Sequence, residues 1–216
     1  MSSLSPWSSL WRSDIFRLSG TTSRLDLLRL LARSRTYRPI YTARLCQSFD
    51  QRGCFGRVTH MLFRQAHKWT QNAAGIDLPW EIQLGPGVAI MHGWGLVISP
   101  DARIGGNVTL FHGVTLGRKD EVSEDGTRTV GGSPILADGV WIGPHSVVLG
   151  PVHIGRNARV AAGSVVLNDV PDGAIVAGNP ARIVRRNAPS DIPNPWPLES
   201  IYPTVSDPLI AVDDPG

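Results

Sequence analysis

The spacing of apolar residues changes twice along the chain. Between residues 23 and 75, apolar side chains recur three or four positions apart, as at Leu27, Leu30 and Leu31. A period of 3.6 residues is that of an α-helix with one buried face. The pattern therefore predicts three short helices, the last of which ends near Gly75.

From residue 76 the period becomes six. Aliphatic residues mark the repeat at Leu84, Ile90, Ile98, Ile104, Leu110 and Leu116, and again at Leu136, Ile142, Val148, Ile154, Val160 and Val166. This spacing fits neither an amphipathic helix nor an alternating strand. It indicates short strands joined by tight turns, three strands to a coil, with one aliphatic side chain per strand directed into a prism. Gly and Asn in "IGGN" and "IGRN" suit the corners.

Two irregularities interrupt the repeat. The unit that contains His92, in "GVAIMHGWGLVIS", is eight residues long, so its turn is expected to bulge outward. Residues 118–134 form a polar, Gly-rich excursion. Loops that leave a rigid solenoid are where binding usually occurs.

The two ends of the chain lack a period. Residues 1–22 are Ser-rich with one short apolar patch, and we expect weak order there or docking onto something larger. Residues 187–216 are rich in Pro and Asp, which indicates an extended or disordered tail. The sequence thus divides into 1–22, a helical region 23–75, a solenoid domain 76–186 and the tail.

The net charge of the chain excludes few classes of partner. Lys and Arg number 21 against 18 Asp and Glu, and many of the arginines fall in residues 12–68. No interleaving of aromatic and basic residues accompanies them, which favours a solubilising surface over nucleic-acid binding. Contact of the N-terminal region with a membrane surface or a glycan-assembly machinery stays open.

Targeting and cysteine patterns favour a cytoplasmic protein. The chain has no signal-peptide pattern and no window of about 18 apolar residues. Cys46 and Cys54 lie eight positions apart without a CxxC or Cys/His cluster, so neither a disulfide framework nor a zinc site is indicated.

The repeats, together with "GIDLPW", "VTLG" and "AGNPARIVRR", resemble the hexapeptide-repeat acyltransferases. Within that family, residues 75–186 look like the serine O-acetyltransferase branch and its relatives that acetylate sugars in exopolysaccharide and colanic-acid assembly. The resemblance implies a left-handed parallel β-helix and homotrimers with active sites between neighbouring prisms. It also implies acetyl transfer from acetyl-CoA to a hydroxyl, with no metal.

The resemblance assigns the catalytic pair to His92 and Asp77. Their separation of fifteen residues is close to one coil, so the two side chains are expected on adjacent coils. An imidazole is an effective base near neutral pH when a carboxylate fixes its tautomer. On its own, a histidine in an apolar run is more often structural.

Two further residues are candidates for acceptor binding. His112 follows His92 by twenty residues and is expected to line the same cleft, although capping a turn is an equal alternative. Trp94 has a ring that suits stacking on a sugar, and packing against a neighbouring subunit is its alternative. His145 and His153 lie in ordinary repeat units, where we expect surface positions.

The cofactor residues are implied by similarity to galactoside acetyltransferases. Arg182 and Arg185, three positions apart in "NPARIVRR", match an arginine pair that contacts the CoA phosphates. By the same alignment Ala162, Leu167 and Asn168 lie along the pantetheine arm.

Two departures from the serine enzymes bear on the acceptor. Met91 stands where they carry Asp, and "VGGSPIL" stands where they carry an Arg-His pair. A zwitterionic acceptor needs both charges matched. We therefore favour an O-acetyltransferase of a saccharide or polysaccharide precursor. Serine O-acetyltransferase and a non-catalytic β-helix scaffold are the alternatives.

Overall fold

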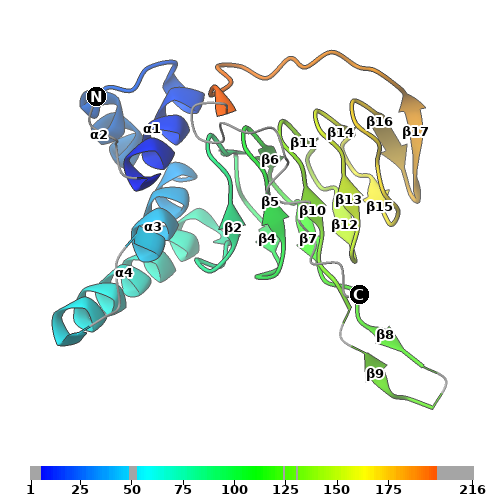
Figure 1. Cartoon of the computed structure of the whole chain (residues 1–216), viewed down its shortest axis with the longest axis horizontal. Helices are drawn as coiled ribbons and strands as arrows, with labels where there is room; N and C mark the ends of the chain where they lie inside the picture. The colour runs from blue at the N-terminus through cyan, green and yellow to red at the C-terminus, as the bar shows by residue number, and fades with distance from the viewer. Residues whose placement is uncertain (1–5, 49–52, 124, 130, 199–216) are drawn as a thin grey trace.

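The computed structural model describes residues 6–48, 53–123, 125–129 and 131–198. Four helices in this part pack at one end of a parallel β-solenoid of about five turns (Figure 1). They are α1 (Pro6–Ser19), α2 (Arg24–Arg33), α3 (Tyr37–Ser48) and α4 (Gly53–Ala74). The helices expected between residues 23 and 75 correspond to α2, α3 and α4.

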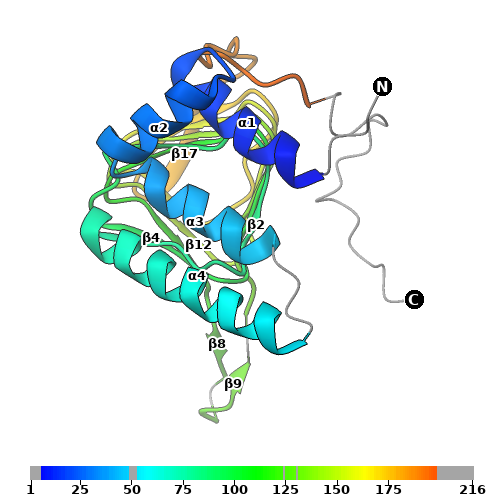
Figure 2. The same cartoon turned by 90° about the vertical axis from the view of Figure 1, so that its left-hand side faces the viewer.

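The solenoid consists of three parallel sheets, and its coils superpose in a triangular outline in Figure 2. Sheet A contains β1 (Ile76–Asp77), β4 (Leu96–Ile98), β7 (Thr115–Gly117), β12 (Val147–Leu149) and β15 (Val165–Val166). Sheet B contains β2 (Gln83–Leu84), β5 (Arg103–Ile104), β10 (Ile135–Leu136) and β13 (His153–Ile154). Sheet C contains β3 (Ala89–Met91), β6 (Thr109–Phe111), β11 (Trp141–Ile142), β14 (Arg159–Val160), β16 (Ile175–Gly178) and the antiparallel β17 (Ala181–Arg185).

The core of the prism is the set of aliphatic positions that defined the repeat. All twelve belong to one buried cluster, and Ile104, Leu110 and Ile142 are fully inaccessible to solvent. Each such side chain contributes about 1.5–3 kcal/mol on burial. The predicted β-helix is therefore confirmed, and its stability comes from the residues that predicted it.

Of the two alternatives for the N-terminal segment, helix α1 agrees with docking onto a larger body rather than with weak order. It packs against the first coils, with Ile15 and Asp14 fully buried. Asp14 accepts hydrogen bonds from Arg44 of α3 and from the Gly87 amide, at 3.2 and 3.0 Å. Arg44 in turn donates to the carbonyls of Leu84 and Gly85. Tertiary contacts with the solenoid thus bury one face of a helix whose apolar residues Trp11, Ile15 and Leu18 recur at helical spacing.

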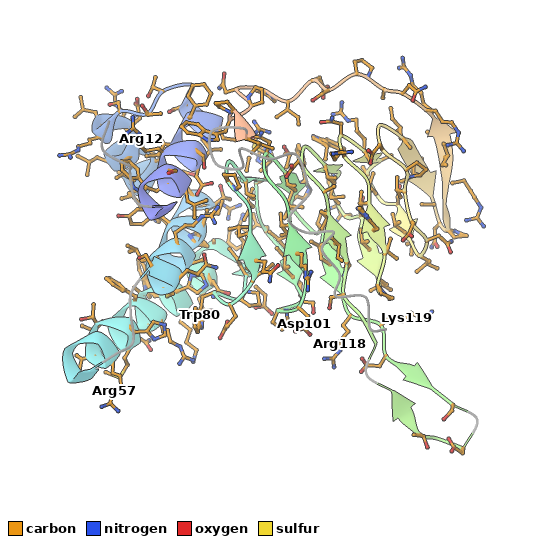
Figure 3. The ribbon with its side chains drawn as sticks, viewed as in Figure 1. Arg12, Arg57, Trp80, Asp101, Arg118 and Lys119 are labelled. Carbon is orange, nitrogen blue, oxygen red and sulfur yellow. The ribbon has the colours of Figure 1, made fainter. Side chains whose placement is uncertain are left out.

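The excursion at 118–134 forms a short antiparallel hairpin of β8 (Glu121–Val122) and β9 (Arg128–Thr129) that projects from the coils (Figure 1). At its base, Arg118 pairs with Asp120 at 2.8 Å and lies 3.8 Å from Asp101. Figure 3 labels Arg118 and Lys119 where the hairpin leaves the solenoid.

After β17 the chain runs back along the solenoid toward α1 (Figure 1). This segment, residues 188–198, is named the strap. Trp196 packs edge-on against Phe16 with ring centroids 5.6 Å apart, and its backbone exchanges two hydrogen bonds with the Asn107 side chain, at 2.9 and 2.8 Å. The expected extended tail is thus held by its own chain as far as residue 198, and residues 199–216 lie outside the described residues.

Candidate active site

Turns that join sheet C to sheet A stack in one line, which is named the corner column and comprises residues 92–95, 112–114, 143–146 and 161–164. Backbone hydrogen bonds fix the stack: Gly113 donates to Trp94 at 2.7 Å, His145 to His112 at 3.0 Å and Gly163 to Pro144 at 2.8 Å. A molecule lying along this corner would therefore contact successive coils.

His92 occupies the first turn of the corner column. Its φ is 68°, and Gly93 and Gly95 also have positive φ, so three left-handed residues make the bulge that the eight-residue unit predicted. The imidazole is exposed, and the ring centroid lies 6.0 Å from that of His112 and 6.4 Å from that of Phe111. Arg35 donates to the His92 carbonyl and holds the turn from outside.

Asp77 lies on the coil below. It is the second residue of β1 and pairs in register with Val97 of β4, and the Gly75 carbonyl accepts from Gly95 in the bulge. The two residues therefore sit on adjacent coils, as their spacing indicated. Within the described part of the chain the exposed Asp77 carboxylate makes no hydrogen bond to His92, and that contact stays a prediction.

The structure adds a third histidine to this corner. His145, expected at an ordinary surface position, is exposed, but its ring stands at 90° to that of His112 with centroids 4.9 Å apart. Gly113 makes the approach feasible, since a Cβ there would lie 2.2 Å from His145 Nδ1. The sequence did carry a signal for this position of His145, namely the register of the repeats. Pairing of Leu110 with Ile142 aligns residue 145 with residue 113.

The acceptor candidates have different surroundings. His112 is half-buried, and its Nδ1 is buried without a hydrogen-bond partner in the described structure. Trp94 is 57% exposed, but the Arg35 guanidinium lies 3.9 Å from its ring centroid. One face of the Trp94 ring is therefore already covered by the protein.

The predicted cofactor residues lie at the end of the solenoid away from the helices. Ala162 belongs to the corner column, and Leu167 and Asn168 are exposed directly after β15. Arg182 and Arg185 are exposed on β17, and among the described residues neither forms an ion pair. The five residues are thus accessible near the last coils, but only Ala162 lies in the corner column, and Arg185 pairs with Ile175 at the opposite end of β16.

Comparison with known proteins agrees with this architecture. Residues 133–168 match the family model "Bacterial transferase hexapeptide (six repeats)". Serine acetyltransferase of Mycobacterium tuberculosis is 36% identical over 157 residues, covering 71% of this chain and 65% of the relative. Serine acetyltransferase 4 of Arabidopsis thaliana is 40% identical over 136 residues, covering 59% of this chain and 37% of the relative. The chain thus spans between about a third and two thirds of the length of these relatives.

Solved structures give the same result. Serine acetyltransferase of Brucella abortus in complex with coenzyme A superposes with a TM-score of 0.67 at 28% identity, covering 84% of this chain and 69% of that one. The fold and the repeats define a hexapeptide β-helix protein. Over residues 133–168 the chain carries the repeats of the bacterial transferase hexapeptide family, and over a longer span it is similar to serine acetyltransferases.

Two expectations need correction or restatement. The closeness to exopolysaccharide and colanic-acid enzymes is not supported, because these relatives are serine acetyltransferases. None of the described helices is long and apolar enough to cross a membrane, and the comparisons give no support to a membrane contact.

Proposed function

We propose that the protein is an O-acetyltransferase that uses acetyl-CoA, with L-serine as the acceptor. The observation that carries the proposal is the bulged turn that presents His92 at the head of the corner column, one coil above Asp77. Similarity to serine acetyltransferases, one of them in complex with coenzyme A, supports both the cofactor and the acceptor. This acceptor replaces the saccharide that the sequence analysis favoured.

The chemistry needs one base. The His92 imidazole takes the proton from the acceptor hydroxyl as its oxygen attacks the thioester carbonyl carbon. The tetrahedral intermediate then collapses, the carbon–sulfur bond breaks, and the departing thiolate receives the proton from the His92 imidazolium. Asp77 is the residue that would fix the tautomer of His92 and stabilise its cation. No covalent enzyme intermediate is required.

The corner column is the proposed path of acetyl-CoA. Arg182 and Arg185 would bind phosphates as charge-assisted donors, and Ala162, Leu167 and Asn168 would contact the pantetheine arm. The thioester would then lie near His112, which is half-buried with its ring centroid 6.0 Å from that of His92. A homotrimer, with each site between two prisms, remains part of the proposal.

Met91 favours a second candidate, acetylation of a saccharide hydroxyl. Its apolar side chain is 38% exposed beside His92, where the serine enzymes that the sequence resembles carry a carboxylate. A neutral acceptor needs no anion at that position. Trp94, exposed in the same turn, would offer an apolar surface to a sugar ring.

Release of the CoA thiol from acetyl-CoA tests both candidates. The purified protein is assayed with L-serine and, separately, with a panel of neutral mono- and oligosaccharides. Turnover of serine with little response to sugars is expected, whereas turnover of sugars alone would replace the first candidate by the second.

Matched histidine variants test the mechanism in the same assay. Removing a general base typically costs about 10²–10⁴-fold in rate, so His92→Ala should lose activity on that scale. His153→Ala, which removes a half-buried histidine on sheet B, should retain most of it. Equal activity of His92→Ala and wild type would exclude the proposed base.

A further inference from the structure

A groove of 350 Å³ lies on the outer side of sheet C, beneath the strap. Its floor is made by Met91, Phe111 and Trp141 from three successive coils, and residues 191–194 of the strap form one wall. Phe111 and Trp141 pack with ring centroids 4.9 Å apart and ring planes at 56° to each other, so they form two adjoining aromatic surfaces. Phe111 also lies beside His92, so the groove adjoins the corner column.

Arg17 of α1 closes the groove and is unusual in its burial. The residue is 5% exposed, and its Nε is buried with no hydrogen-bond partner. The two terminal nitrogens donate to the Pro193 carbonyl at 2.5 Å and to the Thr109 hydroxyl at 2.7 Å, both neutral acceptors. No carboxylate within the described residues pairs with it. Burial of a cation without an anion is costly, and desolvation accordingly lowers the pKa of Arg17.

The charges that line the groove do not balance. Arg159 is neutralised by Asp191 at 2.5 Å, and its guanidinium also lies 4.8 Å from the Trp141 ring centroid. The lining contains no other carboxylate. Arg17 is therefore the one unmatched charge of the lining, and a ligand that completes the site must bring a negative group.

We propose that this groove binds a small organic anion, whose oxyanion pairs with Arg17 and whose planar apolar body lies against Phe111 and Trp141. A guanidinium offers parallel donors that suit a carboxylate or a phosphate. The aromatic floor distinguishes such a ligand from a bare inorganic anion. The proposal does not depend on the transfer reaction, because the groove and its unmatched charge are formed without acetyl-CoA.

Calorimetric titration of the full chain with three probes, in the absence of acetyl-CoA, tests the proposed anion site. Benzoate carries both features, benzamide is its neutral isostere, and inorganic phosphate carries the charge alone. Benzoate should bind at least tenfold more tightly than benzamide, and phosphate should bind more weakly than benzoate. Phosphate binding as tight as that of benzoate would exclude the role of the aromatic floor, and no binding of either anion would overturn the proposal.

Variants locate the site. Arg17→Met should weaken benzoate binding about tenfold or more, whereas Arg17→Lys, which keeps the charge but loses the fork, should weaken it less. Trp141→Leu removes half of the aromatic floor and should weaken benzoate without affecting phosphate. Arg12→Met is the control, because Arg12 lies on the same helix outside the groove lining and donates to Thr22 (Figure 3). Benzoate affinity unchanged in both Arg17→Met and Trp141→Leu would place any binding elsewhere and overturn the proposal.

Discussion

The energetic cost of a left-handed backbone at a corner of the solenoid can be measured at His145. Its φ of 56° lies in the left-handed region, which costs an L-residue about 1–2 kcal/mol relative to glycine. We expect His145→Gly to be about 1 kcal/mol more stable than His145→Ala, because only glycine adopts this φ without strain. Urea denaturation of the two variants measures the difference. Equal stability would mean that the corner relaxes to another conformation.

The burial of Cys46 leads to a prediction about the reactivity of its thiol and about the pH dependence of stability. The thiol is 1% exposed, and burial raises its pKa from 9.0 to about 11. At pH 8 it should resist iodoacetamide in the folded protein and react after unfolding in urea. Because the folded pKa is the higher one, the stabilising contribution is complete below pH 9 and is lost as the pH rises toward 11.

The Cys46 experiment uses a Cys54→Ser variant, so that one thiol is followed. Alkylation in the folded state as fast as in the unfolded state would show that Cys46 is accessible to solvent. Faster alkylation only after denaturation would agree with its burial beside α4.

The residues of the two sites differ in how well their positions could be predicted from the sequence. His92 stands out because its repeat unit is two residues too long, and that irregularity is visible without coordinates. His145 could have been found from the register of the coils. Arg17 could not, since its partners Thr109 and Pro193 lie 92 and 176 positions away and no local pattern encodes such contacts.

At the scale of elements, the strap depends on a corner residue. Asn107 has a φ of 55° and forms both hydrogen bonds to Trp196. Asn107→Gly keeps the left-handed backbone but loses these bonds, which should cost about 1–3 kcal/mol. The strap should then be cut faster by a protease, as followed by mass spectrometry.

Asn157→Gly is the matched control for the strap, because Asn157 has nearly the same φ, 54°, and no hydrogen bond to residues 188–198. Its cleavage rate should equal that of the wild type. Equal rates in the Asn107 and Asn157 variants would show that the Phe16–Trp196 contact holds the strap without the side-chain amide.

Most elements with a period of their own were predicted, and the strap, which has none, was not. The six-residue repeat specified the coils, and helical spacing specified α2, α3 and α4. Helix α1 carries Trp11, Ile15 and Leu18 at helical spacing, a signal that the expectation for this segment did not use, whereas the strap is Pro-rich and has no local signal for its place. Both are positioned by contacts with the solenoid, such as those of Ile15 and Trp196.

For the whole molecule, the open end of the solenoid is the point where the fold needs closure. A solenoid coil without a neighbour leaves backbone groups and core side chains unprotected, and repeat proteins require caps at such ends. Here the cap is polar at its centre: Arg44 satisfies carbonyls of the first coil, and Asp14 satisfies the Gly87 amide. Both side chains are almost completely buried, at 5% and 1% exposed.

Loss of this ion pair should therefore affect the entire chain. Arg44→Met leaves Asp14 buried without its partner and should lower the free energy of unfolding by about 3–5 kcal/mol. Arg156→Met breaks an exposed pair with Asp172 at the other end of the solenoid and should cost less than about 1 kcal/mol. Urea denaturation measures both, and light scattering should detect aggregation only of Arg44→Met, because its first coil is exposed as an unpaired edge. Similar losses in the two variants would mean that apolar contacts of α1 and α3 close the solenoid without the buried pair.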